Sequence, residues 1–246
     1  GAHPDPQYAA RRNDAFIVAV TCTTPSESCW CTGTGGGPQP RADFDIRLTE
    51  LTEGGHRLLA EAGSERGAAL LQRLAAPAAT GADLAAAETV VERAVAAIRR
   101  PVDAAALPMQ LAGKDRDVQW EAVAERCFAC GNCTLVCPTC FCVAYDDVTA
   151  LTDDGGPAVE TVRRQQWASC FQLDHSNLGG KPVRASVASR YRQWLTHKLQ
   201  TWEAQFGTAG CVGCGRCTTW CPAGIDLPAE AALLAAATAP AQGGTQ

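Results

Sequence analysis

The sequence predicts an α+β fold, with an N-terminal α/β region, a helical linker and a C-terminal module built around two identical cysteine runs. Two strand-like stretches, at residues 15–20 and 43–48, indicate the first region. An Ala-rich stretch at 66–100 has the apolar spacing of helices and indicates the linker. The pattern C-x2-C-x2-C-x3-C-P indicates the module, because it begins once at Cys127 and again at Cys211.

The strands follow from local patterns. AFIVAV at 15–20 is a short apolar run typical of a buried strand, and DFDIRL at 43–48 alternates as a half-buried strand does. The loop between them is rich in Cys, Gly and Pro. Its stretch Gly33–Gly37 is not a dinucleotide fingerprint, because Pro38 occupies the third glycine position and no Lys-Ser/Thr pair follows. We expect this loop to be flexible or to wrap a bound group.

Two stretches predict helices with one apolar face. Pro77 and the ATGAD segment divide the Ala-rich stretch into two helices. In the second helix, apolar residues spaced by three and four are expected to pack in the core: Leu84, Ala87, Val91, Val95 and Ile98. A further amphipathic helix is predicted over Ser189–Phe206, with its apolar face formed by Tyr191, Trp194, Leu195 and Leu199.

Composition and charge argue against several classes of protein. The net charge of −5 and the scattered basic residues argue against a nucleic-acid partner. No run of about 18 apolar residues suggests a membrane span, and the N-terminus has no signal-peptide core, so we expect a cytoplasmic protein. Met109 is the only methionine, and we expect the natural chain to begin further upstream.

The expected parts of the chain are 1–110 for the α/β region with its Cys-rich loop and helices, 111–228 for the cysteine module, 138–210 for the insert within it, and 229–246 for a flexible tail.

The two cysteine runs predict two 4Fe–4S clusters. Their spacing is that of bacterial ferredoxins, in which three cysteines bind one cluster and the fourth binds the other. Glycines within the runs allow tight loops whose N–H groups approach sulfur. The expected ligands of cluster 1 are Cys127, Cys130, Cys133 and Cys221, and those of cluster 2 are Cys211, Cys214, Cys217 and Cys137.

Other interpretations of the cysteine runs fit less well. Zinc sites use separated C-x2-C pairs and four ligands in all, and a disulfide framework would not repeat an identical four-cysteine run. Seventy-three residues separate Cys137 from Cys211, which is more than a small free ferredoxin needs. The insert and the N-terminal region favour a fixed electron carrier within a larger complex over a freestanding one.

Six cysteines lie outside the two runs, and their role is left open by the sequence. They are Cys22, Cys29, Cys31, Cys140, Cys142 and Cys170. Buried free thiols, or a two-thiol zinc or redox pair, would explain them without a further cofactor. Two Cys-aromatic-Cys elements among them motivate the sharper hypothesis that four of the six bind a third 4Fe–4S cluster.

No catalytic residue is expected. His175 lies in an Asp-His-Ser-Asn segment and His197 on the predicted aromatic helix, but the chain has no GxSxG elbow and both histidines fit structural roles. The basic stretch that contains Arg184, Arg190, Arg192 and Lys198 fits a solvated helix face. It also fits charge compensation for anionic clusters or a docking face for an acidic partner.

Taken in order along the chain, these motifs resemble a known family. CTTPSESCWC, CGNCTLVCPTCFC, WASC, the YRQWLTHKL helix and CVGCGRCTTWCPAGID are similar to the beta (iron–sulfur) subunit of cytosolic NADP-linked NiFe-hydrogenases, the sulfhydrogenases. The A subunit of anaerobic sulfite reductase shares this 4Fe–4S dicluster family. The resemblance spans nearly the whole chain and would leave out the family's N-terminal portion.

The resemblance implies an iron–sulfur electron-transfer subunit without catalysis of its own. Its expected partners are a flavin subunit that exchanges hydride with NAD(P)H and the small and large NiFe-hydrogenase subunits. In the sulfite branch, a sirohaem subunit replaces the hydrogenase pair. The absence of a dinucleotide fingerprint in this sequence fits that division of labour.

Overall fold

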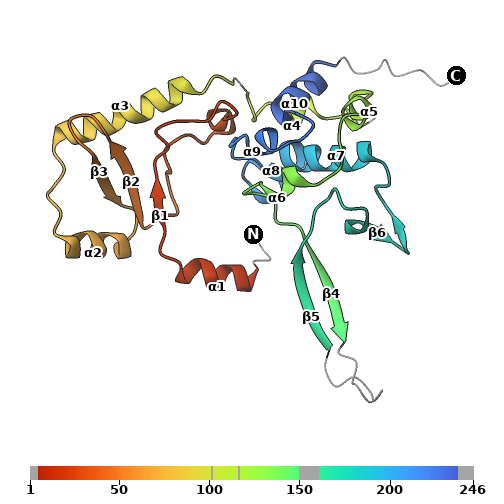
Figure 1. The fold of residues 1–246 in the computed structure, drawn as a ribbon, viewed down its shortest axis with the longest axis horizontal. Coiled ribbons are helices and arrows are strands. Elements are labelled where there is room, and N and C mark those ends of the chain that lie inside the picture. The colour runs from red at the N-terminus through yellow and green to blue at the C-terminus, as the bar shows by residue number, and fades with distance from the viewer. Residues whose placement is uncertain (1–4, 101, 116, 150–160, 238–246) are drawn as a thin grey trace. The chain divides into compact units, whose positions relative to one another are not determined.

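The computed structural model describes residues 5–100, 102–115, 117–149 and 161–237 (Figure 1). These residues form helices and three small sheets, which confirms the expected mixture of α and β structure. The chain divides into two compact units: an N-terminal unit of Gly1–Ala105 with Val212–Gly215, and a C-terminal unit of Ala106–Cys211 with Arg216–Gln246. No helix among the described residues is long and apolar enough to cross a membrane.

The N-terminal unit is built on a three-stranded sheet with the order β1-β2-β3. Strands β1 and β2 run parallel with Val18 opposite Ile46, whereas β2 and β3 are antiparallel with Ile46 opposite Ala62. The elements of this unit are α1 (Pro6–Asp14), β1 (Val18–Val20), the 3-10 turn η1 (Cys31–Thr34), β2 (Ile46–Leu51), β3 (Arg57–Ala62), α2 (Glu65–Leu74) and α3 (Gly81–Ala97).

Both predicted strands are present, but each begins three residues later than its sequence pattern suggests. The delay before β2 has a local cause, since Asp43 adopts a φ of 63° and breaks the extended conformation. Asp45 is buried, and its carboxylate accepts hydrogen bonds from Ile17 N at 2.7 Å and from Ser64 Oγ at 2.6 Å. Asp45 therefore ties the start of the sheet to the first turn of α2.

The core of this unit lies between the sheet and α3. Leu51 and Leu59 pack with Ala87, and small residues of α3 complete the contact. The apolar face predicted for this helix is wrong in part, because Leu84 is 48% exposed and Val95 is 43% exposed. The buried face is instead centred on Ala87 and Ala94, whose methyl groups let the helix approach the sheet closely.

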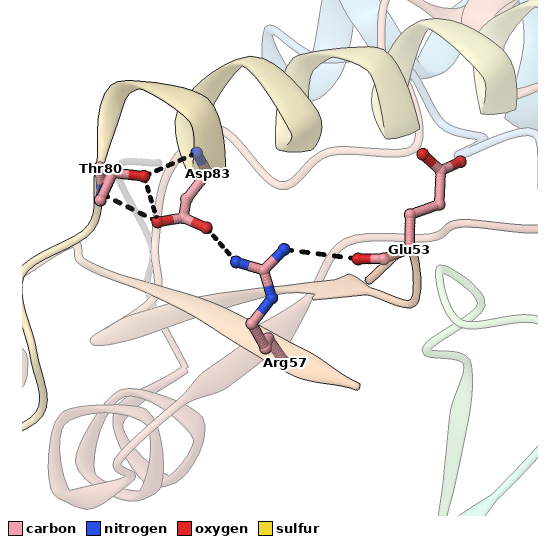
Figure 2. A network of polar contacts seen from close by, with 4 residues as sticks. All are labelled: Glu53, Arg57, Thr80 and Asp83. Carbon is pink, nitrogen blue, oxygen red and sulfur yellow. Dashed lines mark hydrogen bonds and ion pairs between the residues drawn. The ribbon is translucent and has the colours of Figure 1, made fainter. Parts of the chain in front are cut away.

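A polar network fixes α3 on the sheet (Figure 2). The Thr80 hydroxyl accepts from Asp83 N at 3.3 Å, and the Asp83 carboxylate accepts from Thr80 N at 2.9 Å, so the two residues form a capping box. Arg57 of β3 donates to the Asp83 carboxylate and, at 3.4 Å, to the carbonyl oxygen of Glu53. The start of α3 is thereby tied to the β2–β3 turn.

The C-terminal unit is mostly helical, and its core is aromatic. Phe171, Tyr191 and Trp194 contact one another, with the Tyr191 and Trp194 ring centroids 5.5 Å apart, and Trp120 packs on Tyr191. The elements of this unit are α4 (Leu107–Gln110), α5 (Gln119–Ala124), α6 (Asn132–Leu135), β4 (Val143–Thr149), β5 (Thr161–Trp167), η2 (Leu173–His175), β6 (Asn177–Leu178), β7 (Lys181–Pro182), α7 (Val187–Thr196), the π-helix η3 (His197–Thr201), α8 (Trp202–Phe206), α9 (Arg216–Thr219) and α10 (Leu227–Ala236).

The predicted aromatic helix is present as three consecutive segments, α7, η3 and α8. The four residues expected on its apolar face are all buried, and Leu195 is fully so. The π-helical turn in the middle is a feature that the apolar pattern does not predict. Such turns are rare and frequently lie at functional sites.

The antiparallel strands β4 and β5 form a ribbon that extends from the helices of this unit in Figure 1. Every described residue of β5 is exposed, and so are most residues of β4. Arg163 and Asp147 form an ion pair across the strands at 2.7 Å.

The expected flexible tail from residue 229 onward is wrong over its first part. Residues 229–236 belong to α10, in which Ala231 and Leu234 are completely buried. Glu230 of α10 accepts hydrogen bonds from Gln119 and Arg126, so the helix is held by charge as well as by apolar contact. The end of the expected tail, 238–246, lies outside the described residues.

Candidate iron–sulfur site

Five cysteines of the two runs line one pocket of the C-terminal unit. Cys127, Cys130 and Cys133 of the first run share it with Cys221 of the second, and Cys217 also contributes to its wall. The two runs are joined here by a hydrogen bond from Asn132 Nδ2 to the Trp220 carbonyl oxygen at 2.6 Å. The pocket thus brings together the four residues that the sequence assigns to cluster 1.

Local backbone geometry shapes this pocket. Gly131 has a φ of 75° at the start of α6, and a Cβ there would lie 3.2 Å from Ser169 Oγ. Backbone N–H groups point at two of the sulfurs, from Ala129 N to Cys127 Sγ and from Ile225 N to Cys221 Sγ, both at 3.4 Å. N–H donors directed at thiolate sulfur are the contacts that tune the potential of an iron–sulfur cluster.

Two buried donors beside the pocket lack partners. Tyr191 Oη and Trp194 Nε1 are buried, and neither has a hydrogen-bond partner among the residues the structure describes. Both residues line the pocket. A buried polar group without a partner is costly, and a bound group with acceptor sulfurs would satisfy both. The residues present therefore fit a 4Fe–4S cluster held by these cysteines.

Burial makes isolated thiolates unfavourable in this pocket. It raises the pKa of the Cys133 thiol well above its ordinary value, and the neighbouring Cys217 and Cys170 raise it further. Burial also raises the pKa of Cys127. Because metal ligation requires the thiolate form, a cationic iron core is the partner that would stabilise these groups in the charged state.

A second group of ligand candidates is arranged around Lys198, which is buried on the π-helix η3. Its Nζ donates to Cys137 Sγ at 3.4 Å, to Thr139 Oγ1 at 2.8 Å and to the Gly210 carbonyl oxygen at 3.1 Å. Burial lowers the pKa of Lys198, but the thiolates of Cys137, Cys140 and Cys211 outweigh that effect and leave the pKa above its ordinary value. Lys198 thus places a positive charge beside Cys137 and Cys211.

The middle of the second run packs in the N-terminal unit. The Gly213 carbonyl oxygen accepts from Trp30 N at 2.8 Å, and the Cys214 carbonyl oxygen accepts from Cys29 Sγ at 3.8 Å. Gly213 has a φ of 64°, and a Cβ there would lie 2.5 Å from the Cα of Cys31. Only glycine satisfies both the positive φ and the close approach of the backbone.

The six remaining cysteines form two groups of three. Cys22, Cys29 and Cys31 interact electrostatically within the N-terminal unit. Cys140, Cys142 and Cys170 line a cavity of about 260 Å³ within the C-terminal unit. The two Cys-aromatic-Cys elements of the sequence fall in different groups, whereas no sequence pattern places Cys170 with Cys140 and Cys142.

Of the interpretations given for the basic stretch, charge compensation for anionic clusters fits Lys198, which lies beside Cys137 and Cys211. The solvated helix face expected for the basic stretch is wrong for Lys198 and Arg190, both of which are buried. Arg190 donates to the carbonyl oxygens of Arg184 and Ala185. His197 contacts Gln205 at 3.2 Å, as a structural histidine does. No three Cys, His, Asp or Glu side chains in the described part of the chain converge tightly enough to hold a single metal ion.

The comparisons with known proteins agree with this geometry. Residues 126–225 match the family described as "4Fe-4S dicluster domain". The chain is 34% identical over 227 residues to sulfhydrogenase 2 subunit beta of Pyrococcus furiosus; the match covers 91% of this chain and 64% of that relative, which is slightly less than two thirds of its length. No solved structure matches the chain.

The match confirms the resemblance to hydrogenase beta subunits and the assignment of an iron–sulfur electron-transfer role. It also confirms that the cofactors include two 4Fe–4S clusters. Residues 126–225 are a 4Fe–4S dicluster domain, in a chain whose sequence is similar to that of a sulfhydrogenase beta subunit.

Proposed function

We propose that the chain relays electrons between a flavin subunit that oxidises NAD(P)H and the NiFe-hydrogenase subunits of a multi-subunit hydrogenase. The observation that carries this proposal is the 34% identity to a sulfhydrogenase beta subunit, which extends over 91% of the chain and so includes the N-terminal unit as well as the dicluster domain. A freestanding carrier would need only the dicluster domain. When bound, the clusters supply one-electron chemistry, while the chain positions them and tunes their potentials.

Exposed apolar side chains around the cysteine runs support docking of partner subunits. Phe128 and Leu135 of the first run and Trp220 of the second are all more than half exposed. Cys130 is exposed as well. Large exposed apolar groups commonly mark interaction sites, and an electron donor or acceptor must come close to a cluster ligand.

The β4–β5 ribbon offers further support. A two-stranded ribbon on its own is marginally stable in water, and this one is exposed on both faces. It nevertheless carries Val148, Val162 and Trp167, which are each more than a third exposed. Contact with another subunit would cover these apolar groups.

We also propose the crossed ligation that the spacing of the runs predicts. Cys127, Cys130, Cys133 and Cys221 would hold cluster 1, and the cluster 2 ligands would be Cys211, Cys214, Cys217 and Cys137. Cys221→Ser should then alter the spectroscopic signature of cluster 1, whereas Cys137→Ser should alter that of cluster 2. If Cys221→Ser changes only the cluster held by Cys211, the ligands do not cross.

The proposed function is tested by purifying the native complex anaerobically through a tag on this chain. Hydrogen-dependent reduction of NADP, together with hydrogenase large and small subunits in the complex, is the expected result. Sulfite reduction with a sirohaem subunit would place the chain in the sulfite reductase branch instead. A chain that purifies alone, without either activity, would refute the relay and favour a freestanding carrier.

A further inference from the structure

A cavity in the C-terminal unit carries three cysteines that the two ferredoxin runs do not use. Its volume is about 260 Å³, and its wall includes Cys140, Cys142 and Cys170. The three come from two stretches of chain, since the first two lie between α6 and β4 and the third follows β5. The fold therefore brings Cys170 to the other two.

The three thiols lie within electrostatic range of one another. Cys170 interacts electrostatically with Cys142, and Cys140 interacts with Cys170. They are too widely spaced to hold one ion, because no three Cys, His, Asp or Glu side chains among the described residues meet the geometry of a single-metal site. A zinc ion binds four ligands at about 2.0–2.3 Å, so it would require the cavity to collapse. Thiols around an open cavity suit a larger cluster.

Positive charge surrounds the same cavity. Lys198 and Arg184 both line it, and Arg184 lies close enough to Cys170 to interact with its sulfur. A cluster ligated by thiolates carries net negative charge, which a buried site must compensate. These two cations would offset that charge.

The cavity also offers a fourth ligand and a hydrogen-bond donor. His175 lines it, and imidazole is an established ligand of iron. Trp194 lines both this cavity and the cluster 1 pocket, and its Nε1 is buried without a partner in the described part of the chain. A sulfur acceptor in either space would satisfy it.

We propose that Cys140, Cys142, Cys170 and His175 bind a third 4Fe–4S cluster in this cavity. The site lies within residues 126–225 but uses none of the eight cysteines expected to bind the two clusters of the dicluster domain. It adjoins cluster 2, because the side chains of Cys140 and Cys137 lie within hydrogen-bond range of each other. Cys22, Cys29 and Cys31 take no part in it.

The proposal is tested by counting iron and acid-labile sulfide in the intact chain, prepared anaerobically. The wild-type chain should contain about twelve irons, and Cys170→Ser about eight, since each cluster holds four. The matched control is Cys22→Ser, which changes an exposed cysteine of the other group and should leave about twelve. The eight irons retained in Cys170→Ser would show that the variant folds.

The fourth ligand is tested separately. His175→Cys should keep about twelve irons with altered electron paramagnetic resonance g values, whereas His175→Ala should lose about four. Unchanged spectra and iron content in His175→Ala would remove His175 from the site. Two results would overturn the third cluster at this site. One is about eight irons in the wild-type chain, with or without one zinc, and the other is iron loss in Cys22→Ser but not in Cys170→Ser. None of these counts depends on which enzyme complex the chain serves, so failure here is distinct from failure of the proposed relay.

Discussion

Replacing Gly213 by alanine tests whether the second cysteine run needs the close approach to the loop that contains Trp30. A Cβ at this position would lie 2.5 Å from Cys31 Cα and 2.6 Å from Cys31 N, both of them backbone atoms. The backbone of the alanine would also have to adopt a φ of 64°. Neither problem can be relieved by moving the end of a flexible side chain.

The expected cost of Gly213→Ala combines three unfavourable effects and one favourable one. A non-glycine residue in the left-handed region costs about 1–2 kcal/mol, and overpacking costs about 1–3 kcal/mol. Displacing the backbone would weaken the Trp30 N–Gly213 O bond of 2.8 Å, which contributes about 1 kcal/mol. Alanine restricts the unfolded chain and returns about 0.4–1 kcal/mol. The free energy of unfolding should therefore fall by about 2–6 kcal/mol.

The matched control is Gly54→Ala. Gly54 also has a positive φ, of 74°, but a Cβ there meets no atom within 4 Å, so it isolates the conformational effect. Anaerobic guanidinium unfolding followed by tryptophan fluorescence compares the two variants, and Trp30 is a buried reporter beside the substitution. Gly213→Ala should lose at least about 1 kcal/mol more stability than Gly54→Ala. Equal losses would refute the close packing argued from the structure.

Three further predictions concern other parts of the chain. Thr80→Ala removes the N-cap of α3 and should lower the free energy of unfolding by about 0.5–2 kcal/mol. The control Thr89→Ala, within the same helix, should not lower it. Equal losses in the two variants would mean that the cap is unimportant. Hydrogen bonds from a serine hydroxyl, and then from a backbone N–H, hold the pKa of the Asp45 carboxyl below its usual range. The stabilising effect of the ionised carboxylate is therefore complete above about pH 4 and is lost as the pH falls through the lowered pKa. Urea unfolding midpoints should show that the wild-type protein is more stable than Asp45→Asn above this pH and that the difference disappears in acid. A stability difference that persists at the lowest pH would contradict this. Val148→Lys with Val162→Lys, a directly opposed pair on the ribbon, should reduce recovery of partner subunits at unchanged iron content, and full recovery would exclude the ribbon from the interface.

The features that the sequence predicted well depend on short-range patterns. The cysteine spacing fixes the local loop geometry, and the four expected ligands of cluster 1 accordingly line one pocket, together with Cys217. The buried face that includes Trp194 and Leu195 follows from helical periodicity, because large apolar side chains recur there every three or four residues. These parts of the fold need no knowledge of distant contacts.

The features that the sequence missed depend on contacts between distant residues. Lys198 is buried because its ammonium group meets Cys137, which lies 61 residues earlier in the chain. On α3 and α10 the small size of alanine hides which face is buried, since alanine occurs on all sides of both helices. The Cys140–Cys142–Cys170 group is likewise assembled only when β4 pairs with β5 and brings the ends of the ribbon together.

The N-terminal unit is formed by two distant parts of the chain, which has a consequence for its synthesis. Val212–Gly215 belongs to this unit, yet Val212 follows Ala105 by 107 residues. At a translation rate of about 5–20 residues per second, the ribosome needs roughly 5–20 s to supply the missing four residues. During that interval the loop around Trp30 emerges without Gly213 to accept its backbone hydrogen bond. The N-terminal unit thus stays incomplete until Val212–Gly215 has been synthesised.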